Sequence, residues 1–99
     1  MHIISRKALR DFWEKHPDAK GPLEAWFRVA KQTSWRRLLH VQTVYRDAEA
    51  VGNFTVFNMK GNSYGLIASI DYEKRVIFVK YVLTHSEYDK NRWKHDPRF

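Results

Sequence analysis

The sequence contains no cysteine, which excludes disulfide bonds and thiolate chemistry and suits a reducing compartment. With only 4 glycines, it also has no glycine-rich loop of the GxxxxGK type that would hold a nucleoside phosphate. No apolar run approaches the ~18 residues that a transmembrane helix needs. The opening residues, MHIISRKALR, lack the apolar segment of a signal peptide. We therefore expect a cytoplasmic protein that is neither secreted nor inserted into a membrane.

Aromatic residues are abundant, with 4 Trp, 5 Tyr and 6 Phe, and 43% of the chain is hydrophobic. Disordered chains have few aromatic residues, so this composition indicates a folded protein. A length of 99 residues fits one domain, which we expect to span residues 1–99.

The charge is strongly basic, because 18 Lys and Arg residues against 11 Asp and Glu residues give a net charge of +7. A basic excess of this size on a small domain favours a phosphate polymer, and we expect nucleic acid as the partner. A basic soluble surface without such a partner is the alternative that composition leaves open. An anionic membrane is less favoured, because no helix pattern sets a purely basic face against an apolar one.

Apolar periodicity predicts two helices in the first third of the chain. MHII at 1–4 fits a short edge strand, after which apolar residues recur at helical spacing over Arg6–His16. Pro17 ends this helix, because the residue before a proline is disfavoured in the α region. A second helix follows Lys20 and Gly21, with Pro22 suited to its first position, and runs to residue 31 or 32. The aromatic residues of each helix share one stripe, which indicates core rather than a platform for stacking bases.

The segment from 35 to 53 is less regular. Residues 35–45 (WRRLLHVQTVY) fit a short helix or irregular packing, and 46–53 are predicted to form a polar connector. Arg36 and Arg37 are adjacent, so a helix would point them about 100° apart and at least one would face solvent. We interpret the pair as binding phosphates. The alternative, that both side chains lie over apolar surface, is equally open.

Three apolar runs at 54–59, 64–70 and 76–83 predict strands, separated by polar turns at 60–62 and 71–75. In the third strand, strict alternation would place four apolar residues on one face: Ile77, Val79, Tyr81 and Leu83. A short helix is predicted over 87–94. Because helices precede the strands rather than alternating with them, the expected class is α+β. We expect a small antiparallel β-sheet of about 3–4 strands with two to three helices packed on it.

Residues able to transfer protons follow the third strand. His85 comes directly after it, and imidazole is the side-chain type whose ordinary pKa lies near neutrality. Tyr88 follows, and a neighbouring cation would lower the pKa of its hydroxyl, a role that Lys60 or Lys80 would serve. Lys80 is a charged residue in mid-strand, so we expect it to line an accessible surface or a cleft.

A cleft with histidine, tyrosine and lysine but no cage of carboxylates suggests metal-free cleavage of RNA. The ribose 2′-hydroxyl attacks the adjacent phosphate, a base takes its proton and an acid protonates the leaving 5′-oxygen, while cations stabilise the phosphorane. The five histidines have neither HxxxH nor HxxE spacing, so we expect no metal site.

The sequence resembles the HigB-type toxins of bacterial type II toxin–antitoxin modules, within the RelE-like superfamily. HIISRKALRDFWEKHPDA at 2–19, followed by a Pro-Leu-x-x-Trp helix, resembles the opening of that family. Its two most specific motifs are matched by VFNMKGN-x-Y at 56–64 and VLTH-x-EYDK at 82–90. The resemblance implies a RelE-like fold and an mRNA interferase, an endoribonuclease that cuts messenger RNA on the ribosome without a cofactor. It also implies a HigA-like helix-turn-helix antitoxin, through which alone the toxin would reach operator DNA.

Carried onto matching positions, the resemblance makes His85 and Tyr88 the acid–base candidates. Lys60 would contact RNA or stabilise the transition state, and we expect Lys80 to provide further electrostatic support. Asn62 and Asp89 would orient the site. The full set expected to contact RNA is Arg36, Arg37, Asn62, Gly65, Asp89, Lys90 and Arg92.

Two positions depart from the family pattern. Gly65 stands where the family usually has arginine, and Lys80 stands where arginine is frequent. Arginine grips a phosphate with two donors, whereas lysine is a point charge and glycine supplies nothing. We therefore hypothesise an RNase that is weakened or inactive. The alternative function is a non-catalytic module that binds RNA or an antitoxin, and a DNA-binding domain is less favoured because no helix-turn-helix pair is evident.

Overall fold

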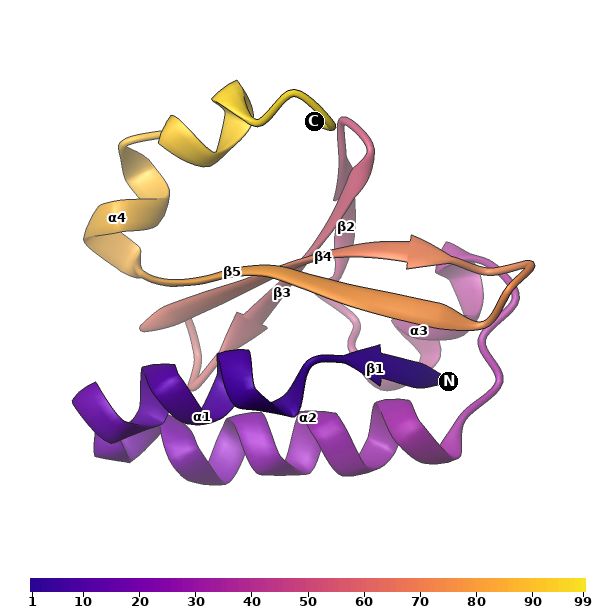
Figure 1. The fold of residues 1–99 in the computed structure, drawn as a ribbon, viewed down its shortest axis with the longest axis horizontal. Coiled ribbons are helices and arrows are strands. Elements are labelled where there is room, and N and C mark those ends of the chain that lie inside the picture. The colour runs from indigo at the N-terminus through magenta and orange to yellow at the C-terminus, as the bar shows by residue number, and fades with distance from the viewer.

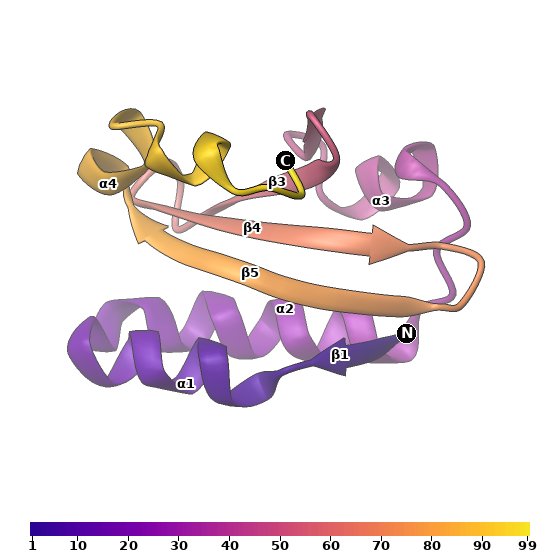
Figure 2. The same ribbon diagram turned by 45° about the horizontal axis from the view of Figure 1, so that its top comes forward.

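The computed structural model describes residues 1–99, which form a five-stranded sheet with two long helices on one face and a C-terminal segment on the other (Figures 1 and 2). The strands, in the spatial order β1-β5-β4-β3-β2, are β1 (His2–Ile4), β2 (Glu49–Val51), β3 (Phe54–Met59), β4 (Tyr64–Asp71) and β5 (Val76–Thr84). The helices are α1 (Arg6–Lys15), α2 (Lys20–Gln32), α3 (Leu38–Val44) and α4 (His85–Asp89), with 3-10 turns η1 (Pro17–Ala19) and η2 (Arg92–His95). The predicted α+β class is confirmed.

The sheet has one strand more than expected, and it is mixed rather than purely antiparallel. β1 runs parallel to β5 and pairs with it only along Val76–Phe78, while the other neighbouring strands are antiparallel. β2 forms inside the segment that was predicted to be a polar connector, where Glu49 pairs with Val56 of β3. A run of three residues, Glu-Ala-Val, is too short to predict a strand from the sequence. Its extended conformation depends on pairing with β3.

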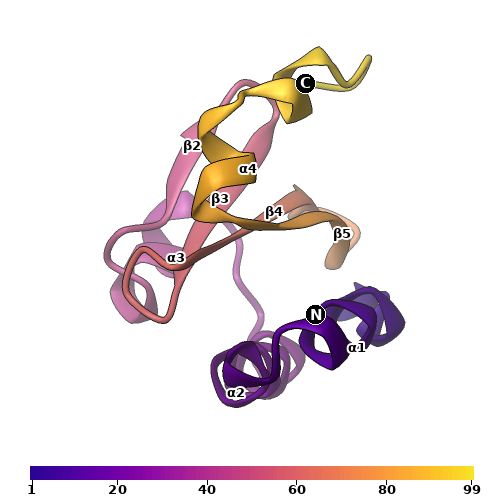
Figure 3. The same ribbon diagram turned by 90° about the vertical axis from the view of Figure 1, so that its left-hand side faces the viewer.

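The two long helices form the layer beneath the sheet. α1 and α2 lie side by side (Figure 3) and run in opposite directions (Figure 1). Their apolar stripes are buried, with Leu9 and Trp13 from α1 and Leu23 and Trp26 from α2 in one core, which confirms that the aromatic stripes are core. α2 begins at Lys20, two residues before Pro22, whose missing N–H is harmless in the first turn. None of the helices has the length and apolar character needed to cross a membrane.

A β-bulge in β5 overturns the predicted alternation of its side chains. Ala68 of β4 pairs with Val79 and Ile67 pairs with Tyr81, so Lys80 is the extra, unpaired residue. Val79 packs in the core beneath the sheet, whereas Tyr81 packs in the cluster above it. The expected single face of Ile77, Val79, Tyr81 and Leu83 is therefore wrong, because one extra residue moves every later side chain to the other face.

The C-terminal segment covers the upper face of the sheet. Trp93 is buried there against Phe54, Val56 and Ile67. The ring of Phe99 packs edge-on against Phe54 and Trp93, with centroids 5.9 Å and 5.7 Å away. The predicted helix at 87–94 is in fact two pieces, α4 and η2, separated by Asn91 in the left-handed conformation.

We expect Phe57→Ala to lower the free energy of unfolding, so that the protein unfolds at a lower urea concentration than the parent. Phe57 is fully buried, and its ring lies 5.4 Å from that of Trp26 and 5.6 Å from that of Tyr45. Such a truncation destabilises proteins by about 3–5 kcal/mol. Phe78→Ala is the matched control, because Phe78 is exposed and its loss should change the free energy of unfolding by less than about 1 kcal/mol. Equal effects in urea titrations would contradict this location of the core.

Candidate functional site

Four of the predicted site residues lie around one pocket of about 210 Å³, which we call the candidate pocket. They are Asn62, Gly65, His85 and Tyr88, and the remaining lining residues are Glu49, Asn58 and Tyr64. The pocket lies at the end of β3, β4 and β5 where α4 begins, on the face of the sheet that carries the C-terminal segment. Residues distant in the sequence are thus brought together by the pairing of these strands.

The backbone fixes the two segments that carry these side chains. Lys60 and Gly61 both have positive φ, 50° and 63°, and form the tight turn between β3 and β4. The N–H of His85 donates to the carbonyl oxygen of Ser63 at 3.0 Å, which joins the start of α4 to that turn. A capping box between Thr84 and Glu87 then begins the helix, with the Glu87 carboxylate accepting from the Thr84 N–H at 2.9 Å. His85 is therefore held at a defined place beside Asn62.

The imidazole of His85 has a carboxylate partner one helical turn away. Its Nε2 lies 3.1 Å from Oδ2 of Asp89, and both side chains are exposed. Asp89 does not line the candidate pocket, so it contacts the site through His85. This placement suits the orienting role expected for Asp89, which remains a prediction.

Tyr88 has a different electrostatic environment from the one predicted. Burial raises the pKa of its hydroxyl, and the negative charges of Glu49 and Asp89 raise it further. The expected neighbouring cation is missing, so the prediction of a lowered Tyr88 pKa is wrong. Tyr88 therefore keeps its proton at neutral pH, which leaves its hydroxyl able to donate a hydrogen bond. Its ring stacks on that of Trp93, with centroids 5.2 Å apart.

Lys60 is held on the other side of the turn by Asp18 of η1. One carboxylate oxygen of Asp18 lies 2.5 Å from Nζ of Lys60, and the other accepts from the Tyr64 hydroxyl at 2.5 Å. These two bonds lower the pKa of Asp18, and the carboxylate raises the pKa of Tyr64. Lys60 does not line the candidate pocket, although Tyr64, which shares its partner, does.

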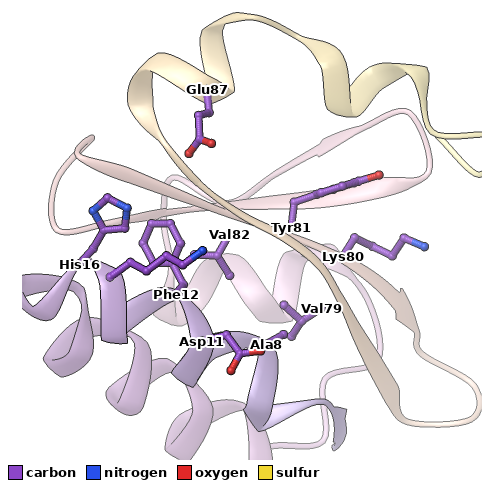
Figure 4. A pocket seen from close by; sticks show the side chains of 10 residues that line it. Ala8, Asp11, Phe12, His16, Val79, Lys80, Tyr81, Val82 and Glu87 are labelled. Carbon is purple, nitrogen blue, oxygen red and sulfur yellow. The ribbon is translucent and has the colours of Figure 1, made fainter.

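Lys80 lies away from the candidate pocket. It lines the largest cavity, which has a volume of about 390 Å³ and lies between α1 and β5 (Figure 4). This confirms the expectation that Lys80 lines an accessible surface or a cleft. Figure 4 shows its side chain pointing away from His16 and Glu87. Its Nζ lies 3.9 Å from Oδ2 of Asp96. The structure thus does not bring Lys80 together with His85 and Tyr88, because Lys80 is in the middle of β5 and the candidate pocket lies at the end of that strand.

The remaining predicted RNA contacts are dispersed. Arg36 and Arg37 are exposed just before α3 and do not line the candidate pocket. Lys90 and Arg92 line a separate cavity of about 220 Å³, whose apolar wall includes Trp93. The roles of all four cations in RNA binding remain predictions.

Sequence reasoning missed Glu49, the one carboxylate that lines the candidate pocket. It comes from β2, which was not predicted, and no motif distinguishes Glu49 from other surface acids. Only the pairing of β2 with β3 places it across from Tyr88, whose pKa it raises. No three histidine, aspartate or glutamate side chains lie together in an arrangement that would hold a metal ion.

Comparison with known proteins identifies the class. Residues 19–91 match the HigB toxin family, described as the RelE-like toxic component of a toxin–antitoxin system. The mRNA interferase toxin HigB of Escherichia coli K12 is 30% identical over 95 residues, which cover 90% of this chain and 88% of the relative. The mRNA interferase HigB of Escherichia coli O6:H1 is 29% identical over 93 residues, covering 91% of this chain and 90% of the relative. The chain belongs to the HigB family.

We expect Glu49→Gln to lower the pKa of the Tyr88 hydroxyl, because the substitution removes a negative charge that disfavours the phenolate. Burial and Asp89 still act, so the pKa stays above the ordinary value of tyrosine. The ultraviolet absorbance of phenolate, after subtraction of the Tyr88→Phe curve, measures the change. Glu73→Gln, in the turn between β4 and β5, is the control and leaves this titration unmoved. Titration of Tyr88 below the ordinary tyrosine range would show that a cation lies beside it.

Proposed function

We propose that this protein is an mRNA interferase, a toxin that cleaves messenger RNA engaged on the ribosome in the cytoplasm. A HigA-like helix-turn-helix antitoxin neutralises it and provides its connection to operator DNA. Membership of the HigB family and the names of its relatives, which are mRNA interferases, support this class. The single observation that carries the proposal is the meeting of Glu49, His85 and Tyr88 in one pocket.

These three side chains have the chemical capacities that metal-free RNA cleavage requires. Glu49 takes the proton of the ribose 2′-hydroxyl as that oxygen attacks the phosphorus. His85 gives a proton to the departing 5′-oxygen, and a 2′,3′-cyclic phosphate remains on the upstream fragment. Tyr88, which holds its proton, donates a hydrogen bond to a non-bridging oxygen of the phosphorane. Asn58 and Asn62 supply neutral amide groups that hold the ribose and phosphate in place.

The candidate pocket lacks a lysine or arginine that would stabilise the transition state of cleavage. Its lining contains the carboxylate of Glu49 but no lysine or arginine, so the developing phosphorane charge meets only neutral donors and His85. Gly65 lies between Asn58 and Leu83 of the neighbouring strands, and an added Cβ would lie 3.3 Å from Cδ2 of Tyr88. An arginine there would extend over the Tyr88 ring and bring a guanidinium to the pocket. This geometry supports the hypothesis that Gly65 weakens cleavage.

The same lack of a cation favours a second candidate function, a non-catalytic module that binds RNA or an antitoxin. Binding to RNA phosphates would then depend on Arg36, Arg37 and Lys60, all of which lie outside the candidate pocket. Substitution of His85 and of Tyr88 separates the two functions.

For the enzyme, we expect His85→Ala to reduce RNA cleavage by about 10²–10⁴-fold, the usual contribution of an acid–base group, and Tyr88→Phe by about 10²–10³-fold, that of a transition-state donor. Single-turnover cleavage with excess protein measures the effect, in the Gly65→Arg background where the parent is too slow. Binding to the antitoxin survives, because neither change empties the core. His2→Ala and Tyr72→Phe are matched controls outside the pocket. Cleavage that persists in both site variants would favour the binding module, for which Arg36→Gln with Arg37→Gln weakens RNA binding and flattens its salt dependence.

Gly65→Arg should increase toxicity and raise the cleavage rate by about 10²–10³-fold, the typical contribution of a transition-state donor. The Tyr88 ring must shift by a few tenths of an ångström to admit the new Cβ. Gly65→Ala introduces the same crowding without the charge and should not increase toxicity. Equal growth arrest by the parent and by Gly65→Arg, both expressed without antitoxin, would show that Gly65 is not the deficiency.

A further inference from the structure

A cluster of unpaired cations lies between α1 and α2, far from the candidate pocket. Arg6 of α1 and Arg28 and Lys31 of α2 line a crevice of about 260 Å³, which we call the cationic crevice. Its other lining residues are Glu24, Phe27 and Gln32. The ion pairs of the molecule involve Lys7, Lys20, Lys60, Lys80 and His85, so no cation of the crevice has a carboxylate partner.

Aromatic rings hold two of these cations in place. The guanidinium of Arg6 lies 5.3 Å from the ring centre of Trp13 and 5.9 Å from that of Phe27. The ammonium of Lys31 lies 5.8 Å from the centre of the Phe27 ring. A cation above a ring keeps its N–H donors available at its edges, so these groups are positioned but not satisfied.

The arrangement is electrostatically unfavourable for the free protein. Lys31 is in the last turn of α2, where the helix dipole favours a cation. Arg6, in contrast, is the first residue of α1, where the dipole repels a cation, and that first turn contains no acidic residue. Glu24 offers limited compensation, because its carboxylate lies 3.8 Å from Nζ of Lys20. Arg6 therefore adds a third cation to the crevice at a place where the helix dipole opposes it, and an anionic partner is the simplest reason for such a position.

The chemistry of the crevice fits a phosphate backbone better than an acidic protein. Protein interfaces are centred on exposed apolar side chains. The large apolar side chains that this molecule exposes are Ile4, Leu39, Val44 and Phe78, and none of them lines the crevice. Phosphate groups need only cations at suitable spacing, and a nucleic acid gains most of its affinity from such contacts.

The position of the crevice indicates which RNA it binds. The α1–α2 layer lies on the opposite side of the sheet from α4 and the C-terminal segment (Figures 2 and 3). A short strand in the candidate pocket therefore does not reach the crevice. We propose that the cationic crevice of Arg6, Arg28 and Lys31 binds the phosphate backbone of a second, folded RNA segment while the pocket engages the RNA to be cut. This inference rests on the proposed function, because it presumes that RNA is the substrate.

The test is a comparison of two triple variants, both made in the full chain with His85→Ala to prevent cleavage. One carries Arg6→Gln, Arg28→Gln and Lys31→Gln; the control carries Lys74→Gln, Lys94→Gln and Arg98→Gln, which remove the same charge elsewhere. The probe is transfer RNA, a folded RNA, titrated over a series of salt concentrations. We expect the crevice variant to bind roughly tenfold more weakly or worse, with a salt slope shallower by about 2–3, since each phosphate contact contributes about 0.9. The control should stay near the parent.

Two further measurements make the outcome unambiguous. The crevice variant should still show a cooperative thermal transition well above the assay temperature, because its three changes remove only cation–π contacts, each of which contributes little to stability, so weak binding is not explained by unfolding. With His85 restored, it should cut a short single-stranded RNA like its parent.

Equal loss of transfer RNA binding in both triple variants, no loss in either, or no binding by the parent would overturn the proposal. Loss of antitoxin binding with unchanged RNA binding would also overturn it and would assign the crevice to a protein. Because binding is measured without cleavage, failure here is separate from failure of the proposed enzyme activity.

Discussion

The packing of Trp93 against the upper face of the sheet is the contact on which the candidate site depends. Trp93 is buried beside Phe54, Val56 and Ile67, and its indole N–H donates to the carbonyl oxygen of Tyr88 at 3.1 Å. A buried indole contributes both a large apolar area and a donor that must find an acceptor. Here the acceptor belongs to the residue whose side chain enters the candidate pocket. The capping box and the bond from His85 to Ser63 hold the start of α4, and the Trp93 contact holds the backbone at Tyr88.

The sequence alone could predict the elements whose signals are local. Pro17 after an amphipathic run marks the end of α1, and Lys60-Gly61-Asn62 marks the turn between β3 and β4. The grouping of His85, Tyr88 and Asn62 could also be expected, through the resemblance to a known family. The predictions of elements depend on residues within one turn or one hairpin of each other, where propensity and spacing carry most of the information. The grouping of site residues depended on the resemblance instead.

Predictions failed where distant residues decide the outcome. Nothing near Glu49 in the sequence shows that β3 will draw it into a strand. The bulge at Lys80 could not be predicted from the sequence either, because the apolar residues around Lys80 alternate regularly. In the structure, the bulge places Val79 and Tyr81 on opposite faces of the sheet. Lys60 was expected to face the site, but Asp18, 42 residues away, pairs with it. The charge of the candidate pocket was therefore misjudged, although most of its residues were identified.

The bulge has a consequence for how the molecule behaves at high concentration. β1 covers β5 only as far as Phe78, so the remainder of β5 forms part of an outer edge of the sheet. A long, flat edge of this kind invites a strand from another copy and leads to aggregation. The extra residue bends the strand at that point and places a lysine there, and both features oppose such pairing. The opposite edge, β2, is only three residues long. The irregularity at Lys80 thus protects the sheet from self-association.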